Sequence, residues 1–304
     1  LGFIGSGNYA QSVLLPSLNK MKVNLKALVS RNPVTASYLG KKYKFKKVSC
    51  NLSEILDDNE INTVFIATNH DSHANLVIEC LKNNKNIYIE KPLCLNNKEL
   101  NSIIRAHKSS KARLIVGFNR RFAPYYQLSK SLLSISDAPS VINIMINAGV
   151  VEKENWVNDK IIGGGRVIGE MCHFLDLLVF LTNSLILDLN TSYLNHSHGK
   201  NIFVTLKLAN GSIGNIHYIT NGNRSFPKER VEIFQSEKIV QINNFKSIKF
   251  FGWKNQRSKF SFIQNKGARE MINVFLKSSL KKEVMSMEEI INVTKASFEI
   301  DKTN

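Results

Sequence analysis

The chain has 304 residues, 43% of them hydrophobic, which is enough apolar material for the cores of one or two ordinary domains. No apolar run approaches the roughly 18 residues that cross a bilayer, and no basic-then-apolar signal segment opens the chain. We therefore expect a soluble protein of the cytoplasm. Its four cysteines show neither paired nor metal-ligand spacing, so a reduced compartment and no metal site are expected.

Lysine and arginine outnumber aspartate and glutamate by 41 to 24, for a formal charge of +17. The densest basic stretch, 41–47, interleaves lysines with aromatic residues as nucleic-acid surfaces do, but solvated loops have the same composition. The excess is spread over the whole chain and falls in no recognised nucleic-acid module. We therefore favour a role for the charge in steering a phosphorylated cofactor and an anionic substrate.

The first predicted element is a strand at 1–4 that runs into a glycine turn, Gly5-x-Gly7-x-x-Ala10. Glycine allows the tight turn at Gly5 and a close approach of a pyrophosphate at Gly7, while Ala10 lets a helix pack on the strand. The following helix and a second strand at 25–29 complete a βαβ unit. The start of the chain therefore predicts a dinucleotide site, with the phosphates on the helix N-terminus.

The second strand ends in Ser30 and Arg31, where a carboxylate usually holds the adenosine ribose. A hydroxyl and a guanidinium can instead bind a 2′-phosphate, which a carboxylate would repel. We therefore favour NADP over NAD, and leave open the alternative that Arg31 is a stacking or solvated side chain.

Strands and helices continue to alternate up to residue 118. The predicted elements are a short helix at 52–56, a strand at 62–67, a helix at 73–83, a strand at 86–89, a helix at 98–107 and a strand at 113–118. This alternation predicts an α/β fold with a parallel, doubly wound sheet. Thr68 and Asn69 end the third strand at its carboxyl edge, and His73 either caps the next helix or contacts a cofactor.

The 86–89 strand runs directly into Glu90-Lys91-Pro92. Proline ends strand pairing, so the Lys91 ammonium group is delivered to the sheet edge where open α/β folds bind ligands. In isolation, Glu90 and Lys91 could equally be an exposed charged pair. Because this strand shares its edge with the glycine turn, we interpret Lys91 as a site residue and Glu90 as its structural anchor.

Beyond residue 118 the pattern becomes strand-rich. The predicted strands are 140–149, 202–208, 213–219, 230–234, 238–242 and 247–253, and helices return near 271–279 and 286–300. This pattern predicts an α+β domain with a large, mostly antiparallel open sheet. We place the two domains at 1–118 and 119–304, with the last helix available to pack back on the first domain.

One conspicuous helix of the second half is predicted to begin at the glycine-rich segment 163–166 and to continue to residue 180. Glu170, His173 and Asp176 are spaced three apart, so they share one face of this helix. An imidazole beside a carboxylate is suited to general acid–base catalysis. A histidine that only caps or pairs locally within an apolar helix would show the same pattern.

Four motifs in this order resemble one family of oxidoreductases. They are Gly5-x-Gly7-x-x-Ala10, Glu90-Lys91-Pro92, Asn119-Arg120-Arg121-Phe122 and His173-x-x-Asp176. Together they are similar to the glucose-fructose oxidoreductase/inositol dehydrogenase (Gfo/Idh/MocA) family. The chain most resembles the C-terminal half of two-part members whose N-terminal half is similar to zinc-dependent alcohol dehydrogenases. Such a fusion would explain why the first residue is Leu1 and not methionine.

The resemblance implies a Rossmann-type domain that binds NAD or NADP, and oxidation or reduction of a hydroxyl or keto carbon on a sugar, cyclitol or nucleotide-linked sugar. It makes Lys91 the lysine beside substrate and nicotinamide, and His173 the proton-transferring histidine. The acid of many members stands four residues before that histidine, where this chain has Gly169 and places Glu170 next to it. Asp176 is expected to orient His173 or to bind a substrate hydroxyl.

The expected site therefore has two groups of residues. The catalytic residues are Lys91, His173, Glu170 and Asp176. The cofactor-binding residues are Gly5, Gly7, Asn8, Tyr9, Ser30, Arg31, Thr68, Asn69, His73, Glu90, Lys91, Asn119 and Arg120. The resemblance also implies a homo-oligomer, either a dimer or a tetramer. A cofactor-binding regulator without turnover, an NAD-assisted glycosidase and a nucleic-acid binder remain as alternatives.

Overall fold

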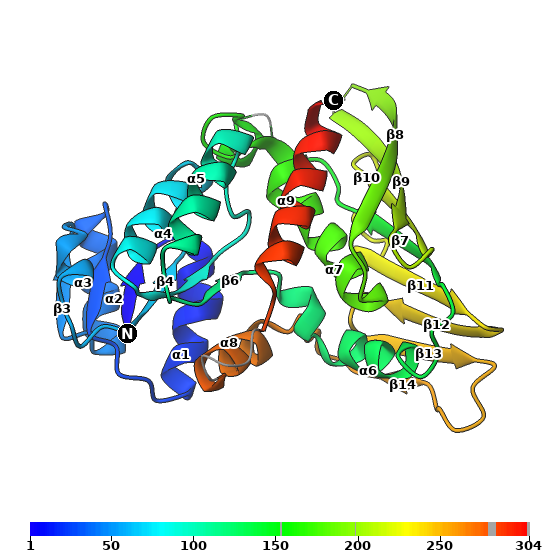
Figure 1. Cartoon of the computed structure of the whole chain (residues 1–304), viewed down its shortest axis with the longest axis horizontal. Coiled ribbons are helices and arrows are strands. Elements are labelled where there is room, and N and C mark those ends of the chain that lie inside the picture. Colours follow the sequence, from blue (N-terminus) through cyan, green and yellow to red (C-terminus); the bar gives the residue numbers. More distant parts are fainter. Residues whose placement is uncertain (153, 198, 279–283, 303–304) are drawn as a thin grey trace. The chain divides into compact units, whose positions relative to one another are not determined.

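The structure is a computed structural model that describes residues 1–152, 154–197, 199–278 and 284–302. The chain divides into two compact units, with the elements shown in Figure 1. Unit 1 comprises Leu1–Gly117, Asp159–Gly165 and Ala268–Ile290, and unit 2 comprises Phe118–Asn158, Arg166–Gly267 and Ile291–Asn304.

Unit 1 is built on six parallel strands in the order β3-β2-β1-β4-β5-β6. The strands are β1 (Gly2–Ile4), β2 (Ala27–Val29), β3 (Lys47–Ser49), β4 (Thr63–Ile66), β5 (Asn86–Ile89) and β6 (Leu114–Val116). The helices of this unit are η1 (Ala10–Leu14), α1 (Leu15–Lys20), α2 (Pro33–Tyr43), α3 (Ser53–Leu56), η2 (His70–Ser72), α4 (His73–Lys82), α5 (Asn97–Lys108) and α8 (Ala268–Lys277). The predicted parallel, doubly wound sheet is confirmed.

Aromatic rings on neighbouring strands form the centre of the unit 1 core. Phe65 on β4 stacks on Tyr88 of β5 at 4.5 Å and on Phe3 of β1 at 6.2 Å between ring centroids. Phe275 of α8 meets the Phe65 ring edge-on at 5.9 Å. This contact explains why α8, which the sequence placed in the second domain, packs in unit 1 beside α1 (Figure 1).

The basic stretch 41–47 is part of two elements that the sequence did not predict, α2 and β3. Asn32 caps the start of α2, where its Oδ1 accepts a hydrogen bond from Thr35 N at 3.0 Å. The helix ends at Lys44, which takes a left-handed conformation with φ of 57°. The lysines obscured an apolar stripe that buries Leu39 and Tyr43.

Unit 2 contains an eight-stranded sheet in the order β14-β13-β12-β11-β7-β10-β9-β8. Its strands are β7 (Val141–Asn147), β8 (Ile186–His196), β9 (Gly199–Leu208), β10 (Ile213–Ile219), β11 (Glu229–Gln235), β12 (Lys238–Asn243), β13 (Ser247–Phe251) and β14 (Lys259–Phe260). All neighbours are antiparallel except β7 and β10, which pair in parallel. The predicted mostly antiparallel open sheet is therefore confirmed, although β8 and β14 were not predicted.

Helices cover one face of this sheet. The helices of this unit are η3 (Asn119–Phe122), α6 (Pro124–Leu133), η4 (Trp156–Asn158), η5 (Val167–Met171), α7 (Cys172–Thr182) and α9 (Met287–Lys302), which begins in unit 1. A Cβ on Gly214 of β10 would lie 2.6 Å from the Leu178 side chain, so α7 approaches the sheet closely at this glycine. Residues 142, 144 and 146 of β7 are buried on this face, and the alternate residues are more exposed.

Two predicted helices need correction, and a third helix was missed. The helix expected from 163 begins later, because Gly164 and Gly165 have positive φ values of 72° and 79° and form a turn before η5 and α7. The α6 helix was not predicted. The helix expected at 271–279 is α8, and residue 279 lies outside the described residues. Among the helices that the structure describes, none is long and apolar enough to span a bilayer.

Candidate active site

The two glycines of the opening turn have different physical reasons to be glycine. Gly5 has a φ of 109°, and a Cβ there would lie 2.2 Å from the carbonyl oxygen of Ala67. The fold itself therefore demands glycine at this position. Gly7 has no such constraint, because a Cβ there would meet nothing within 4 Å. The open space above the Gly7 backbone fits the close approach of a pyrophosphate, so the turn can hold a dinucleotide.

The ends of four parallel strands lie in one line beside this turn. The register pairs Ile4 with Val29 and with Ile66, and Ile66 with Ile89. The residues that follow these strands therefore share the carboxyl edge of the sheet, where open α/β folds bind ligands. This edge brings together the expected site residues Gly5, Ser30, Thr68, Glu90 and Lys91.

Ser30 is buried and links two turns of this edge. Its hydroxyl lies 2.7 Å from the Ser6 hydroxyl in the glycine turn, and it accepts a hydrogen bond from Asn32 N at 3.2 Å. Arg31 beside it is exposed. At the end of β2, the guanidinium of Arg31 is therefore the accessible cation, and Ser30 supports the glycine turn.

Two histidines support the turn that follows β4. His73 is fully buried, with Nδ1 2.6 Å from Pro92 O and Nε2 3.2 Å from Thr68 O. Burial lowers its pKa to about 4 despite these carbonyls, so the ring is neutral near pH 7 and donates through one nitrogen. His70 Nδ1 lies 2.7 Å from Gly163 O, and burial lowers its pKa to about 3.

His73 was predicted either to cap the helix or to contact a cofactor. In the structure its ring nitrogens instead face backbone carbonyls. No side-chain cap is formed at the start of α4. The imidazole instead ties the turn after β4 to the turn after β5. Asn69 in the same turn is exposed and accessible at the carboxyl edge.

Glu90 is a buried carboxylate directly before Lys91. Its Oε1 accepts a hydrogen bond from the Tyr88 hydroxyl at 2.7 Å, and a Cβ on Gly117 would lie 2.9 Å from Oε2. Burial raises the pKa of Glu90 to about 7, although the Tyr88 hydrogen bond and the Lys91 charge oppose the shift. The side chain is an anchor beneath the turn, not an accessible cofactor contact. Lys91 is partly exposed, and its bond to Pro92 is cis.

In unit 2, Glu170 lies at the centre of a charged network. Its carboxylate accepts hydrogen bonds from Lys228 Nζ at 2.6 Å and from the Tyr218 hydroxyl at 2.5 Å, and Arg166 Nη2 lies at 3.5 Å. Burial would raise the pKa of Glu170, but Lys228, Tyr218 and Arg166 together lower it to about 2. Glu170 is therefore a fixed anion at neutral pH and does not carry a proton in a reaction near pH 7.

Two buried ion pairs formed by η3 involve two of the expected site residues, Asp176 and Arg120. Arg121 Nε donates to Asp176 Oδ2 at 3.0 Å and Nη2 to Oδ1 at 2.5 Å, and the Asp176 carboxylate is fully buried. Arg120 likewise makes two hydrogen bonds to Glu229, at 3.0 and 2.6 Å. The structure therefore places Asp176 in a buried ion pair with Arg121, and the Arg120 guanidinium is committed to Glu229.

His173 and Asn119 are also buried in unit 2. The His173 side chain is in the first turn of α7, with its ring edge-on to Phe118 at 6.3 Å between centroids. Asn119 Nδ2 donates to Lys266 O at 2.9 Å, so this side chain supports a loop of the same unit. The sequence showed no sign of the two partners of Glu170, which are Lys228 and Tyr218. They lie 58 and 48 positions from Glu170 in the chain, and no local pattern links residues so far apart.

Comparisons with known proteins agree with this fold. Residues 1–118 match the family model described as "Oxidoreductase family, NAD-binding Rossmann fold". The chain is 30% identical over 187 residues to Oxidoreductase P35 of Formosa agariphila, and 26% identical over 172 residues to trans-1,2-dihydrobenzene-1,2-diol dehydrogenase of Xenopus tropicalis. These alignments cover 58% and 56% of this chain. They cover 58% and 52% of the relatives, so the chain spans little more than half of their length.

The fold is also that of a solved levoglucosan dehydrogenase in complex with NADH and levoglucosan. The TM-score is 0.85 at 18% sequence identity, over 99% of this chain and 96% of that one. This likeness agrees with the architecture that the four motifs indicated, a Rossmann-type sheet followed by a mostly antiparallel sheet. Residues 1–118 thus match the model of the Gfo/Idh/MocA oxidoreductase family, the family that the sequence resembles.

Proposed function

We propose that this protein is an NAD(P)-dependent dehydrogenase or reductase that acts on a CH–OH group of a sugar, cyclitol or nucleotide-linked sugar. The observation that carries the proposal is the open space above Gly7, beside a turn that Gly5 fixes and at the sheet edge that ends in Lys91. The names of the relatives support the reaction class, because one is a diol dehydrogenase and a structural neighbour is a levoglucosan dehydrogenase.

The cofactor contacts are assigned to the accessible part of the carboxyl edge in unit 1. They comprise the backbone of Gly5, Gly7, Asn8 and Tyr9 for the phosphates, and Thr68 and Asn69 beyond β4. A bound nicotinamide ring supplies the hydride acceptor or donor of the reaction. Arg31 supports a preference for NADP, because its exposed guanidinium can pair with a 2′-phosphate.

The chemistry on the substrate is assigned to three side chains. His173 takes the proton of the reacting hydroxyl during oxidation and returns it during reduction. Lys91 stabilises the charge that develops on that oxygen. Glu170 remains ionised and holds Lys228 and Tyr218 in place, so it shapes the polar side of the substrate site without exchanging a proton.

A substrate panel tests this proposal. The protein is mixed with NAD or NADP and with sugars, cyclitols and nucleotide-linked sugars, and the reduced-nicotinamide absorbance band is followed. Net cofactor reduction with at least one CH–OH substrate is expected. Dinucleotide binding with no turnover across the panel would indicate a regulator. Release of a hydrolysed sugar without net cofactor reduction would indicate a glycosidase, and either result would overturn the proposal.

A further inference from the structure

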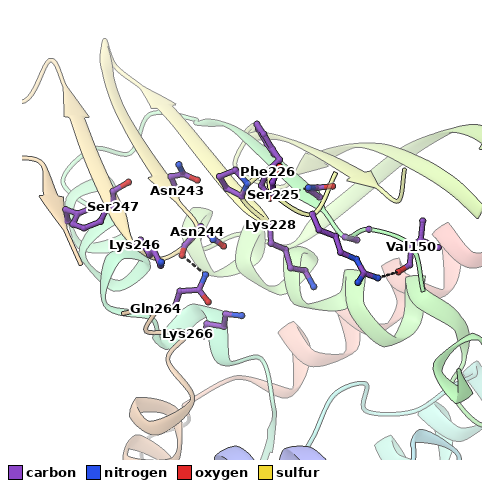
Figure 2. Close-up of a pocket in the computed structure, with 16 residues that line it drawn as sticks. Val150, Ser225, Phe226, Lys228, Asn243, Asn244, Lys246, Ser247, Gln264 and Lys266 are labelled. Atoms are coloured by element: carbon purple, nitrogen blue, oxygen red, sulfur yellow. Dashed lines mark hydrogen bonds between the residues drawn. The ribbon is translucent and has the colours of Figure 1, made fainter. Parts of the chain in front are cut away.

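Unit 2 contains a cavity of about 650 Å³ at one end of its sheet, shown in Figure 2. It lies between the segment after β7, the loop before β11, the β12–β13 turn, β14 and the loop before α8. The residues that line it are Asn147, Ala148, Gly149, Val150, Arg224, Ser225, Phe226, Pro227, Lys228, Asn243, Asn244, Lys246, Ser247, Phe260, Gln264 and Lys266. Its volume lies within the range of ordinary small-molecule sites.

The lining of this cavity is positively charged. It includes Arg224, Lys228, Lys246 and Lys266, and its residues include no aspartate or glutamate. In Figure 2 the side chains of Lys228 and Lys266 extend toward the same space from different segments. Burial lowers the pKa of Lys266, and the like charges of Arg120 and Lys228 add to the shift, although the charges of Glu229 and Glu170 oppose it. Cations that line one cavity are stabilised when an anion binds between them.

The two carboxylates that act on Lys266 are already engaged with other partners. Glu229 receives both hydrogen bonds of Arg120, and Glu170 accepts from Lys228 and Tyr218. Because the cavity lining contains no aspartate or glutamate, no carboxylate of the cavity wall faces Arg224, Lys246 or Lys266. The Arg224 guanidinium is partly positioned, because its Nη2 donates to Val150 O at 3.3 Å and its remaining N–H groups can meet a ligand.

The cavity connects directly to the helix that carries the proposed proton acceptor. Lys228 Nζ donates to Glu170 Oε1 at 2.6 Å, and Glu170 precedes His173 by three residues in the continuous helical segment 167–182. A ligand in the cavity would therefore lie beside the substrate side of unit 2. Phe226 and Phe260 are exposed at the cavity and offer apolar surface to the rest of such a ligand.

From this charge, volume and connection, we propose that the cavity binds an anionic group of the substrate, a carboxylate or a phosphate, remote from the reacting hydroxyl. This inference rests on the proposed function and narrows its substrate class to acidic carbohydrates. A carboxylate would come from a uronic acid, and a phosphate from a sugar phosphate or a nucleotide-linked sugar. Arg224, Lys246 and Lys266 are the residues that recognise the anion, and Lys228 joins it to the Glu170 network.

Binding measurements test the cavity independently of turnover. Isothermal titration uses the protein saturated with NAD, so that the glycine turn of unit 1 is already filled. The probes are glucuronate, glucose 6-phosphate and UDP-glucose, with neutral glucose as the reference. At least one anionic probe is expected to bind about tenfold or more tightly than glucose, and to weaken as ionic strength rises. The tightest probe distinguishes the carboxylate from the phosphate source.

Matched variants locate the binding. Lys246→Gln and Lys266→Gln should each weaken the preferred anionic probe about tenfold and leave glucose binding unchanged. Lys249→Gln is the control, because Lys249 is exposed on the neighbouring strand β13 and does not line the cavity. Thermal melting verifies that each variant is folded. Equal affinity for neutral and anionic probes, or equal losses in Lys249→Gln and Lys246→Gln, would overturn the proposal.

The failure of this inference can be distinguished from the failure of the proposed function. Cofactor reduction with neutral sugars that is unaffected in Lys246→Gln and Lys266→Gln would remove the anion site and keep the dehydrogenase. Anion binding that both variants weaken, with no cofactor reduction by any probe or panel substrate, would support the anion site and remove the dehydrogenase.

Discussion

Replacing Glu90 by glutamine should stabilise unit 1, and the effect should depend on pH. Burial raises the pKa of Glu90 from 4.5 to about 7, so the folded protein holds the proton more tightly than the unfolded chain. Below pH 4.5 the carboxyl is protonated in both the folded and the unfolded state and costs little stability. As pH rises from 4.5 through 7, the unfolded chain releases its proton first, so folding stability is lost. A pKa shift of this size lowers the free energy of unfolding by about 3 kcal/mol at pH 8.

Glutamine has nearly the same shape, stays neutral and can still accept the hydrogen bond of Tyr88. Urea unfolding followed by far-UV circular dichroism should therefore show that Glu90→Gln gains about 2 kcal/mol more stability at pH 8 than at pH 5. Trp156 and Trp253 both lie in unit 2, so their fluorescence separates the unfolding of that unit. Glu79→Gln is the control, because this carboxylate is 43% exposed and pairs with Lys82 on the surface of α4.

The control should change stability by less than about 0.5 kcal/mol at either pH. The reasoning would be refuted by a gain for Glu90→Gln that is equal at both pH values, or by a loss of stability at pH 8. An equal gain would mean that folding does not raise the pKa of Glu90, and a loss at pH 8 would mean that the surroundings stabilise the carboxylate as an anion.

Three further predictions follow from the same contacts. Gly7→Ala should weaken dinucleotide binding with little change in melting temperature, whereas Gly5→Ala should lower the melting temperature, because only the second Cβ would clash; equal effects on both would contradict the distinction. Asp176→Asn should destabilise unit 2 by about 3–5 kcal/mol in denaturant titrations, since it leaves the buried Arg121 charge uncompensated; a neutral result would show that Arg121 finds another partner. Arg31→Ala should weaken NADP binding about tenfold and leave NAD binding unchanged in calorimetry, and equal or tighter binding of NAD by the unmodified protein would end the NADP preference.

Much of unit 1 could be predicted because the sequence patterns that specify its strands, helices and glycine turn are local. Each strand and helix up to residue 118 is a short stretch with its own hydrophobic period, and the glycine turn is a contiguous motif. Two elements, α2 and β3, were missed where lysines dominate the composition. A usable signal was nevertheless present, since Asn32-Pro33 is a good N-cap and first helical residue.

The roles of the charged side chains in unit 2 depend on distant partners. Arg121 and Asp176 are 55 residues apart, and Arg120 and Glu229 are 109 residues apart. No local spacing in the sequence can therefore indicate either ion pair. The sequence placed Asp176 on the same helix face as His173, the candidate catalytic residue, but could not show that Arg121 donates to both of its carboxylate oxygens. The expected homo-oligomer, the cytoplasmic location and the fusion to an alcohol dehydrogenase-like half stay predictions.

The central claim is that Lys91 and His173 perform chemistry on a substrate while other residues of the chain hold the cofactor. It is tested by measuring kcat for the best substrate of the panel, together with the Kd for the preferred cofactor, in the unmodified protein, Lys91→Ala and His173→Ala. We predict that kcat falls about 100-fold or more in each variant while the Kd changes less than about threefold. Turnover retained in both variants would contradict the account.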